Sequence, residues 1–404
     1  MVDRIVLVGA GQAAASLAET LRAKGHKGGI TLVGDEPAPP YQRPPLSKKY
    51  LLGEMEAERL WLKPGSFYEE QGVELRLGVR AAAIDRASRE VVLEDGTRLR
   101  YDRLALTIGA RPRRLPPEMG GDLGGVHVVR TLADVDAMAT AFRPGARLAV
   151  IGGGYIGLEA ASVARSRGLD VTLIEAALRI LGRVACAETA DWFRALHQSH
   201  GVRFREGAVV EALEGVGGRL TGVRLAGGET VKADFAVVGI GVQPNVELAE
   251  AAHLGLVNGI AVDLACRTSD PLIFAAGDVA SFPWRGRRIR LESVQNAIDQ
   301  AKVAAASMLG EPIRYEPTPW FWSDQYDVKL QIAGLNLGYE TVITRPGARE
   351  GTCSHWYFAQ GRLVAVDAMN DARAYMSAKR WIEAGRSPEP AALTDPAADL
   401  KALA

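Results

Sequence analysis

The chain has 404 residues, which is long enough for two or three domains that each bury a core of their own. Hydrophobic residues make up 48% and charged residues 24%, a composition that excludes a disordered or fibrous protein. Lysine plus arginine and aspartate plus glutamate both number 48, so the zero net charge gives no reason to expect nucleic acid or an anionic membrane as a partner.

The first residues, MVDRIVLVGAG, lead directly into an apolar strand, with Asp3 and Arg4 beside its start. This arrangement leaves no room for the basic region, apolar core and cleavage site of a signal peptide. No apolar run approaches the roughly 20 residues that span a bilayer. We therefore expect a cytoplasmic protein that makes no membrane contact.

One pattern occurs twice along the chain: an apolar strand, a glycine-rich turn, an alanine-rich helix and a terminal glycine. It covers residues 4–25 and 147–168. Each copy is followed by a second apolar strand that ends in an acid, at 29–36 and at 170–176. Two βαβ units are therefore expected, and with them an α/β fold that contains two Rossmann-like dinucleotide-binding domains.

The first glycine-rich turn, GAGQAA, has the residues that a pyrophosphate site needs. Gly9 makes the tight turn, and Gly11 lets the backbone approach phosphates that would lie at the N-terminus of the following helix. Ala14 stands where a third glycine often packs helix against strand. About 20 residues later, either Asp35 or Glu36 can accept the two hydroxyls of an adenosine ribose.

The second turn, GGGYIG, repeats the device with Gly152, Gly154 and Gly157. Glu175, about 20 residues later, would repel the 2′-phosphate of NADP, and no arginine follows it directly, so we expect a preference for NADH. Arg179 and Arg183 lie further along the chain and leave some tolerance of NADP open. A single turn of this kind could be a βα turn without a ligand, but two complete units predict that the chain binds two dinucleotides.

The segments between and after these units predict further strands. Residues 90–113 should form a hairpin with a turn at Asp95 and Gly96, followed by a strand that opens into a loop. Beyond residue 240 the pattern gives another buried strand at 271–280. From Trp320 onward it changes to that of a small antiparallel sheet with a helix, an α+β domain, and the proline-rich residues 315–320 form the expected hinge.

Several segments together resemble a known protein family. The two fingerprints, TIGARPR at 107–113 and IFAAGDVA at 273–280 are similar to those of the two-dinucleotide-binding flavoproteins of glutathione reductase type. PYQRPPLSK at 40–48, LESVQNA at 291–297 and PWFWSDQ at 319–325 narrow the resemblance to the ferredoxin reductases of oxygenase systems, the group of putidaredoxin reductase and biphenyl dioxygenase ferredoxin reductase. The match runs in order over essentially the whole chain.

The first unit is interrupted by the second and then resumed, which is the layout expected of a domain that holds FAD tightly. We therefore predict an FAD-binding domain at 1–110 and 241–319, an NAD-binding domain at 111–240 and a C-terminal α+β domain at 320–404. The resemblance places Asp278 at the ribityl and phosphate region of FAD, Arg130 and Ala81 in contact with FAD, and Thr107 and Gly109 at the crossover between domains. The further contacts that it implies are Ala13, Arg43 and Gly277 for FAD, and Tyr155, Ile156, Arg183 and Gly241 for NADH.

A flavin that accepts a hydride becomes negatively charged at N1 and O2. The helix that starts at Val294 would aim its free N–H groups and positive dipole end at that charge. The resemblance also places Lys48 against the flavin ring and pairs it with Glu159, and Pro44 and Pro45 would stiffen the loop that carries the lysine. Read as sequence alone, Lys48 could equally be a surface lysine and Glu159 a helix-capping acid.

Trp320 approaches the flavin and the nicotinamide by the same resemblance. The competing interpretation is a core aromatic, because Trp320, Phe321 and Trp322 also look like the start of a packed strand. We expect Trp320 to act at the site together with Lys48 and Glu159.

The three cysteines are far apart and include no CxxC pair, so a dithiol cannot take up the two electrons of a hydride. We expect the electrons to leave the flavin one at a time to a 2Fe-2S ferredoxin. An arginine cluster would steer the ferredoxin into a transient complex. That cluster consists of Arg285, Arg287, Arg288 and Arg290. The alternative interpretation of this segment is a solvated hairpin without a docking role. No metal site is expected, because His197 and His200 have helical spacing but no third ligand.

The predicted function is that of a flavoprotein reductase. It would transfer hydride from NADH to FAD and then single electrons to a ferredoxin that feeds a cytochrome P450 or a ring-hydroxylating dioxygenase. Two alternatives stay open, an NADH oxidase and an NADH-binding flavoprotein similar to apoptosis-inducing factor. The first usually needs a reactive cysteine near the flavin, for which Cys186 is poorly placed.

Overall fold

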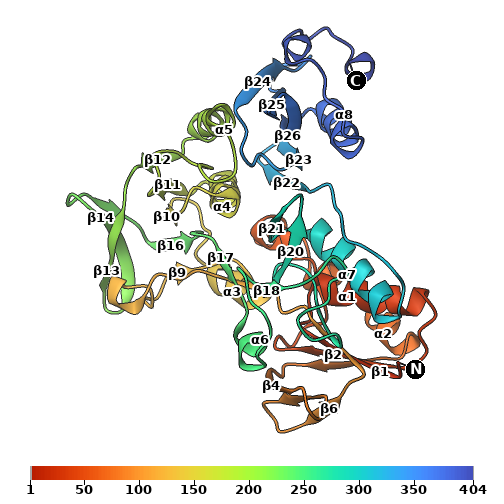
Figure 1. Ribbon diagram of the computed structural model, residues 1–404. Coiled ribbons are helices and arrows are strands. Elements are labelled where there is room, and N and C mark those ends of the chain that lie inside the picture. Colours follow the sequence, from red (N-terminus) through yellow and green to blue (C-terminus); the bar gives the residue numbers. More distant parts are fainter. Residues whose placement is uncertain (1, 404) are drawn as a thin grey trace. The chain divides into compact units, whose positions relative to one another are not determined.

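The structure, a computed structural model, describes residues 2–403 and divides them into two compact units (Figure 1). The first unit comprises residues 2–43, 55–111 and 242–317, and the second comprises 44–54, 112–241 and 318–403. The segments predicted to form the NAD-binding and C-terminal domains thus share the second unit. Residues 44–54, which include Lys48, belong to that unit as well.

The first unit is built on a parallel sheet with the strand order β19-β7-β1-β2-β3. Its strands are β1 (Arg4–Val8), β2 (Gly29–Gly34), β3 (Val73–Leu77), β7 (Arg103–Leu106) and β19 (Ile273–Ala275). The apolar residues of β1 and β19 are almost all buried, as expected for parallel strands that are covered on both faces. Because β1 lies between β2 and β7, the strand order reverses at its carboxyl end, where open α/β sheets bind ligands.

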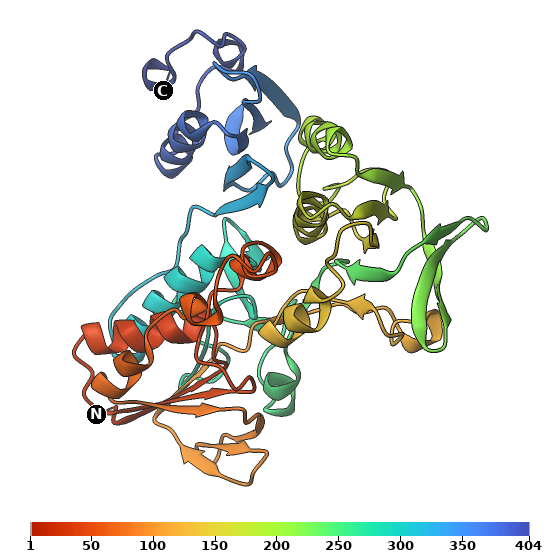
Figure 2. The ribbon, with the colours of Figure 1, turned by 180° about the vertical axis from the view of Figure 1, so that it is seen from behind.

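Four helices belong to this unit: α1 (Gln12–Ala23), α2 (Gly65–Glu70), α6 (Glu247–Ala251) and α7 (Val294–Met308). Helices α1 and α7 pack against each other and lie side by side in Figures 1 and 2. Leu17 and Leu21 of α1 are fully buried in the same core as Ile5 and Leu7 of β1. Helix α1 ends where Gly25 takes a left-handed φ of 85°, a common helix stop.

Three small sheets complete the first unit. The first contains β4 (Ala81–Asp85), β5 (Glu90–Leu93) and β6 (Arg98–Arg100) and is antiparallel, so the hairpin predicted around Asp95 and Gly96 is confirmed. The second pairs β8 (Ala110–Pro112) with β17 (Val242–Pro244). The third contains β18 (Ile260–Ala261), β20 (Ala280–Trp284) and β21 (Arg287–Ile289).

The second unit contains a further parallel sheet, with the order β12-β11-β10-β16-β9. Its strands are β9 (Val126–His127), β10 (Arg147–Ile151), β11 (Asp170–Glu175), β12 (Arg203–Glu206) and β16 (Phe235–Val238). The helices are α3 (Leu132–Ala139), α4 (Tyr155–Ser166) and α5 (Ala187–Ser199), and an antiparallel sheet adds β13 (Val210–Val216), β14 (Arg219–Leu225) and β15 (Thr230–Lys232). Strand β10 lies between β11 and β16, which reproduces the reversal seen at β1.

The C-terminal part of the second unit is an antiparallel sheet of order β22-β23-β26-β25-β24 with one long helix, which agrees with the predicted α+β pattern. The strands are β22 (Trp320–Gln325), β23 (Val328–Gly334), β24 (Thr341–Pro346), β25 (Cys353–Ala359) and β26 (Arg362–Met369). Helix α8 (Ala372–Glu383) packs on β23 and β26, and Trp356 and Trp381 meet in the core between helix and sheet. None of the helices within residues 2–403 has the length and apolar character that crossing a bilayer requires.

Candidate functional site: two dinucleotide cradles and a buried lysine–glutamate pair

The first glycine-rich turn lies at the carboxyl end of β1. Gly9 has a φ of 105°, and a Cβ placed there would lie 2.4 Å from the carbonyl oxygen of Thr107. The Thr107 hydroxyl lies within hydrogen-bonding distance of the carbonyls of Val8 and Gly9, at 3.0 and 2.8 Å. The turn is therefore held tightly against β7, and only glycine fits at its tip.

Gly11 has a different role, because it is the N-cap of α1 and has no side chain to accept the first N–H groups of the helix. No described atom lies within 4 Å of a Cβ built at Gly11, so the space before the helix is open. Ala14 is fully buried, and Ala13 lies 3.3 Å from a Cβ built at Gly277. Free N–H groups that face open space fit the pyrophosphate of a dinucleotide.

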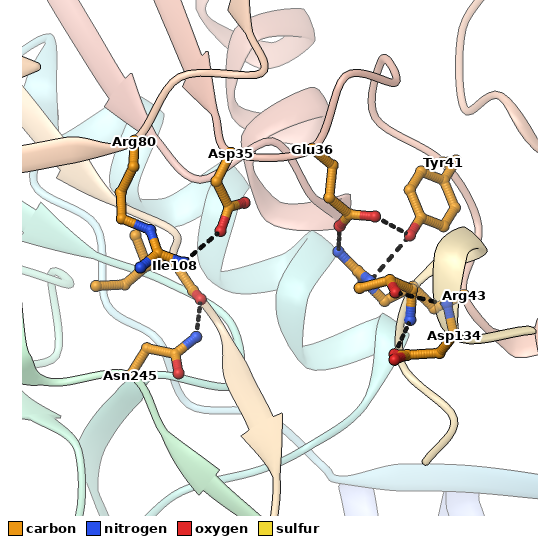
Figure 3. Close-up of polar contacts among 9 residues, drawn as sticks. Asp35, Glu36, Tyr41, Arg43, Arg80, Ile108, Asp134 and Asn245 are labelled. Atoms are coloured by element: carbon orange, nitrogen blue, oxygen red, sulfur yellow. Dashed lines mark hydrogen bonds and ion pairs between the residues drawn. The ribbon is translucent and has the colours of Figure 1, made fainter. Parts of the chain in front are cut away.

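The acids after β2 have different surroundings (Figure 3). Asp35 is 59% exposed and lies 3.4 Å from Arg80. Glu36 accepts hydrogen bonds from the Tyr41 hydroxyl at 2.5 Å and from the Arg43 guanidinium at 2.6 Å. Arg43 also lies over the Tyr41 ring, 4.9 Å from its centroid. Glu36 therefore fixes the start of the proline loop, and sequence reasoning missed this cluster although the acid, tyrosine and arginine are only seven residues apart.

The remaining predicted FAD contacts of the first unit lie on three separate segments. Ala81 begins β4, and Gly109 lies between β7 and β8, where Asn245 binds the neighbouring Ile108 carbonyl at 2.7 Å (Figure 3). Gly277 donates its N–H to the Gln300 side chain at 2.8 Å, and Asp278 follows it after β19. The Asn245 contact, which the sequence did not suggest, is what holds the crossover segment in place.

The start of α7 is capped more fully than the sequence suggested. The Ser293 hydroxyl accepts the N–H of Asn296 at 3.2 Å, so this one N–H already has a partner, and the approach of the helix start to the flavin stays a prediction. Val294 is the first residue of the helix, and the Ser293 hydroxyl does not bind its N–H group. The signal was a serine three residues before the asparagine, which is the usual spacing of an N-cap.

The second glycine-rich turn, in the other unit, reproduces the first. Gly152 has a φ of 108°, and a Cβ there would lie 2.4 Å from the Gly239 carbonyl oxygen. Gly154 is the N-cap of α4 and, like Gly11, borders open space, whereas a Cβ on Gly157 would lie 2.0 Å from the Gly152 carbonyl oxygen. The third glycine therefore lets helix and strand approach closely, while Gly154 leaves the helix N-terminus free for phosphate.

Glu175 ends β11 beside this turn. Its carboxylate accepts the N–H of Gly153 at 2.6 Å and that of Ala177 at 2.7 Å. These bonds use one lone pair on each oxygen and orient the carboxylate for a ribose. Arg179, whose position in the sequence leaves NADP tolerance open, donates to the Cys186 carbonyl at 3.1 Å, and Arg183 lines a small surface pocket with Arg179.

Tyr155, Ile156 and Gly241 lie around the second turn. The Tyr155 hydroxyl is buried and has no hydrogen-bond partner among the described residues, and its ring packs 5.0 Å from that of Phe321. Burial raises the pKa of this hydroxyl well above its ordinary value, so it stays protonated. Ile156 is exposed, and Gly241 accepts the N–H of Arg113 at 2.9 Å. A buried hydroxyl without a partner is unusual in a folded protein, and the contact of Tyr155 with NADH stays a prediction.

Lys48 and Glu159 form a direct ion pair within the second unit. The lysine Nζ lies 2.5 Å from Oε2 of Glu159, and the two side chains are 19% and 4% exposed. The same oxygen accepts the Ser47 hydroxyl at 2.9 Å, and Oε1 accepts the Ser323 hydroxyl at 2.7 Å. Glu159 lies inside α4, four residues after its first residue, so it does not cap the helix. The surface interpretation of this pair is therefore wrong.

Trp320 begins β22 and packs partly buried against the C-terminal core. Its ring centroid lies 5.6 Å from that of Trp322 and 6.3 Å from that of Tyr375, and the Lys379 ammonium lies 5.7 Å above it. These contacts agree with the core interpretation, and the approach to the flavin stays a prediction. Arg130, also in this unit, precedes the capping box of α3 formed by Thr131.

The four arginines of the predicted docking cluster differ in their exposure to solvent. Arg290 is only 9% exposed and binds the Asp278 carbonyl and Glu292, so it is not a free surface charge. Arg288 binds two carbonyls but remains largely exposed, as do Arg285 and Arg287. Three of the four arginines are therefore available to attract an anionic partner.

Cys186, His197 and His200 have structural contacts in the described residues. Cys186 is the N-cap of α5, and burial raises the pKa of its thiol, which disfavours the reactive thiolate of an oxidase. Within residues 2–403, no group of three or more His, Cys, Asp or Glu side chains is arranged to hold a metal ion. His197 instead binds Gln325, and His200 stacks on Tyr326.

Two glycine cradles at strand-order reversals, each followed by an acid, define a dinucleotide-binding oxidoreductase. The chain belongs to the pyridine nucleotide-disulphide oxidoreductase family, whose model matches residues 3–301, and residues 320–404 match the reductase C-terminal family. It is 43% identical to rhodocoxin reductase of Rhodococcus erythropolis, over 97% of this chain and 92% of the relative. It is 44% identical to the ferredoxin–NAD(+) reductase component of the anthranilate 1,2-dioxygenase system of Burkholderia cepacia, over 99% and 98%.

A solved structure supports the same family assignment. The crystal structure of the covalent putidaredoxin reductase–putidaredoxin complex contains a chain that is 40% identical, with a TM-score of 0.96 and coverage of 99% of this chain and 98% of that one. The fold class predicted from the sequence and the family resemblance are therefore confirmed.

Proposed function

We propose that this protein is an NADH-dependent flavoprotein reductase that delivers single electrons to a 2Fe-2S ferredoxin of a cytochrome P450 or ring-hydroxylating dioxygenase system. The observation that carries the proposal is the presence of two open dinucleotide cradles in a chain that matches ferredoxin reductases over its full length. Bound FAD would supply the step from a two-electron donor to a one-electron acceptor. The protein contributes binding, orientation and charge.

The residues divide between the two nucleotides. The FAD pyrophosphate would lie at the N-terminus of α1, beyond Gly11, and NADH at the N-terminus of α4, beyond Gly154. Glu175 would accept the NADH ribose hydroxyls and repel a 2′-phosphate, which supports NADH over NADPH. We further propose the domain division 1–110 with 241–319, 111–240 and 320–404, and a cytoplasmic location, where NADH is available.

Lys48 and Glu159 are proposed as catalytic residues at the flavin. A partly buried ammonium held at 2.5 Å by a buried carboxylate has one preferred position, so it could act on the flavin without reorganising. Trp320 is proposed as the aromatic partner of the nicotinamide. Arg285, Arg287 and Arg288 are proposed to steer the ferredoxin toward the electron exit.

Anaerobic stopped-flow spectroscopy of the purified holoprotein tests the function. NADH should bleach the flavin rapidly and NADPH slowly, and added ferredoxin should restore the oxidised spectrum with two ferredoxins reduced per NADH. Slow bleaching with a long-lived charge-transfer band would instead indicate a binding protein similar to apoptosis-inducing factor. Fast oxygen consumption that ferredoxin does not increase would indicate an oxidase.

A further inference from the structure

The Glu159 carboxylate is the end of a chain of hydrogen bonds that runs through the second unit. Ser323 donates to Oε1 of Glu159 at 2.7 Å, and Nε2 of Gln325 lies 3.2 Å from the Ser323 hydroxyl. Oε1 of Gln325 lies 2.8 Å from Nε2 of His197, and Nδ1 of His197 lies 3.3 Å from the Tyr326 hydroxyl. Four contacts thus link α4, β22 and α5.

Every inner member of this chain is removed from water. Ser323, Gln325 and His197 are fully buried, and Glu159 is 4% exposed. A buried polar group must be paired, so a break at any point would leave a group unsatisfied. Ser323 and Gln325 are two residues apart on β22, which puts both side chains on the same face of the strand.

The protonation state at one end fixes the direction of all four bonds. An ionised carboxylate only accepts, so the Ser323 hydroxyl must donate to Glu159 and must itself accept from Gln325. The Gln325 amide then turns its N–H2 group to Ser323 and its oxygen to His197. His197 must therefore carry its proton on Nε2, which leaves Nδ1 free to accept from Tyr326.

The surroundings of His197 agree with a neutral ring. Burial lowers the pKa of His197 to about 4, the Gln325 bond opposes this and the neighbouring His200 adds to it. The rings of Phe204 and Tyr326 pack around His197 at 6.3 and 5.0 Å, and His200 stacks on Tyr326 at 3.7 Å. A neutral imidazole can donate at one nitrogen and accept at the other, as the chain demands.

We propose that Ser323, Gln325 and His197 are positioning residues that hold Glu159 ionised and turned toward Lys48, with His197 fixed as its Nε2–H tautomer. All donors point toward Glu159, so their dipoles add in stabilising its negative charge. An amide does not pass protons on readily, so Gln325 makes the chain a means of orientation rather than a path for protons. The proposal rests on the catalytic role proposed above for the Lys48–Glu159 pair.

The first test uses the unmodified holoprotein. Nitrogen-15 NMR of the protein labelled at histidine should show His197 at pH 7 with Nε2 protonated and Nδ1 bare, and a His197→Gln variant assigns its signals among the six histidines. In Gln325→Leu this single tautomer should give way to a mixture. A His197 that carries its proton on Nδ1 in the unmodified protein would overturn the proposal, regardless of the rate at which NADH reduces the flavin.

The second test is kinetic and compares two buried serines of the same sheet. Ser323→Ala removes the donor to Glu159, whereas Ser354→Ala removes a hydroxyl that accepts from Trp356 and lies outside the chain. In Ser323→Ala the rate constant for flavin reduction by NADH should fall several-fold, because the carboxylate loses the hydrogen bond that turns it toward Lys48. The KM for NADH should stay unchanged, and Ser323→Thr, which keeps the hydroxyl, should restore the rate constant.

The outcomes separate the two proposals. If NADH fails to reduce the flavin of the unmodified protein, the proposed function fails, and the NMR measurement still decides the tautomer. If reduction is fast but the rate constant falls equally in Ser323→Ala and Ser354→Ala, or in neither, the positioning role is refuted. Circular dichroism of each variant establishes that it is folded before its rate constant is compared.

Discussion

Replacing Lys48 by methionine tests the buried ion pair most directly, since methionine keeps the length of the side chain and removes the charge. Removing one partner of a buried pair typically costs about 3–5 kcal/mol, because the other charge stays buried. Here Ser47 and Ser323 still donate to Glu159, and each such bond offsets about 1 kcal/mol. We therefore expect the free energy of unfolding at pH 8 to fall by about 2 kcal/mol.

Urea unfolding of the variant and of the unmodified protein at pH 8 measures this difference in the free energy of unfolding.

The matched control removes both charges. The double variant Lys48→Met with Glu159→Gln should recover at least about 1 kcal/mol of the loss at pH 8, because no uncompensated charge remains. A single Lys48→Met variant that lies within about 0.5 kcal/mol of the unmodified protein would refute the reasoning, since surface substitutions behave in that way.

Three further predictions follow from single features. Gly11→Ala should reduce bound FAD and leave NADH binding intact, whereas Gly154→Ala should raise the KM for NADH about tenfold with FAD retained, because each added methyl enters space that only a ligand would occupy. Burial raises the pKa of Asp367 from 3.8 to about 6, so stability should fall by about 2 kcal/mol as pH rises from 4 to 7, and Asp367→Asn should flatten this slope in unfolding titrations. Arg287→Glu should raise the KM for ferredoxin several-fold at low salt and not at high salt, with the exposed Arg314→Glu as control, and equal effects of the two would end the docking proposal.

Local patterns predicted the dinucleotide cradles well. The turn at Gly9 and its repeat at Gly152 depend on residues close in sequence, where backbone sterics decide the structure. The acid at Glu175 follows from the fixed length of a βαβ unit. The amino-acid sequence alone is therefore enough to predict these features.

Contacts between distant segments could not be predicted in this way. Ser323 meets Glu159 across 164 positions of sequence, and only the packing of β22 on α4 brings them together. The sequence offered only a weak signal, because Ser323 and Gln325 belong to a continuous polar run with Asp324, and their spacing of two residues places them on one face of the strand. The burial of Arg290 could not be predicted either, because a charge pattern does not distinguish a buried arginine from its exposed neighbours.

The position of Ser323 and Gln325 on β22 limits how the protein can be divided. A chain shortened before Trp320 would lose both residues, and the acid at the centre of α4 would lose its Ser323 partner. The C-terminal segment thus supplies a hydrogen-bond partner to the carboxylate that binds Lys48. Exchanging it between related reductases should succeed only when the helix that it covers is exchanged with it.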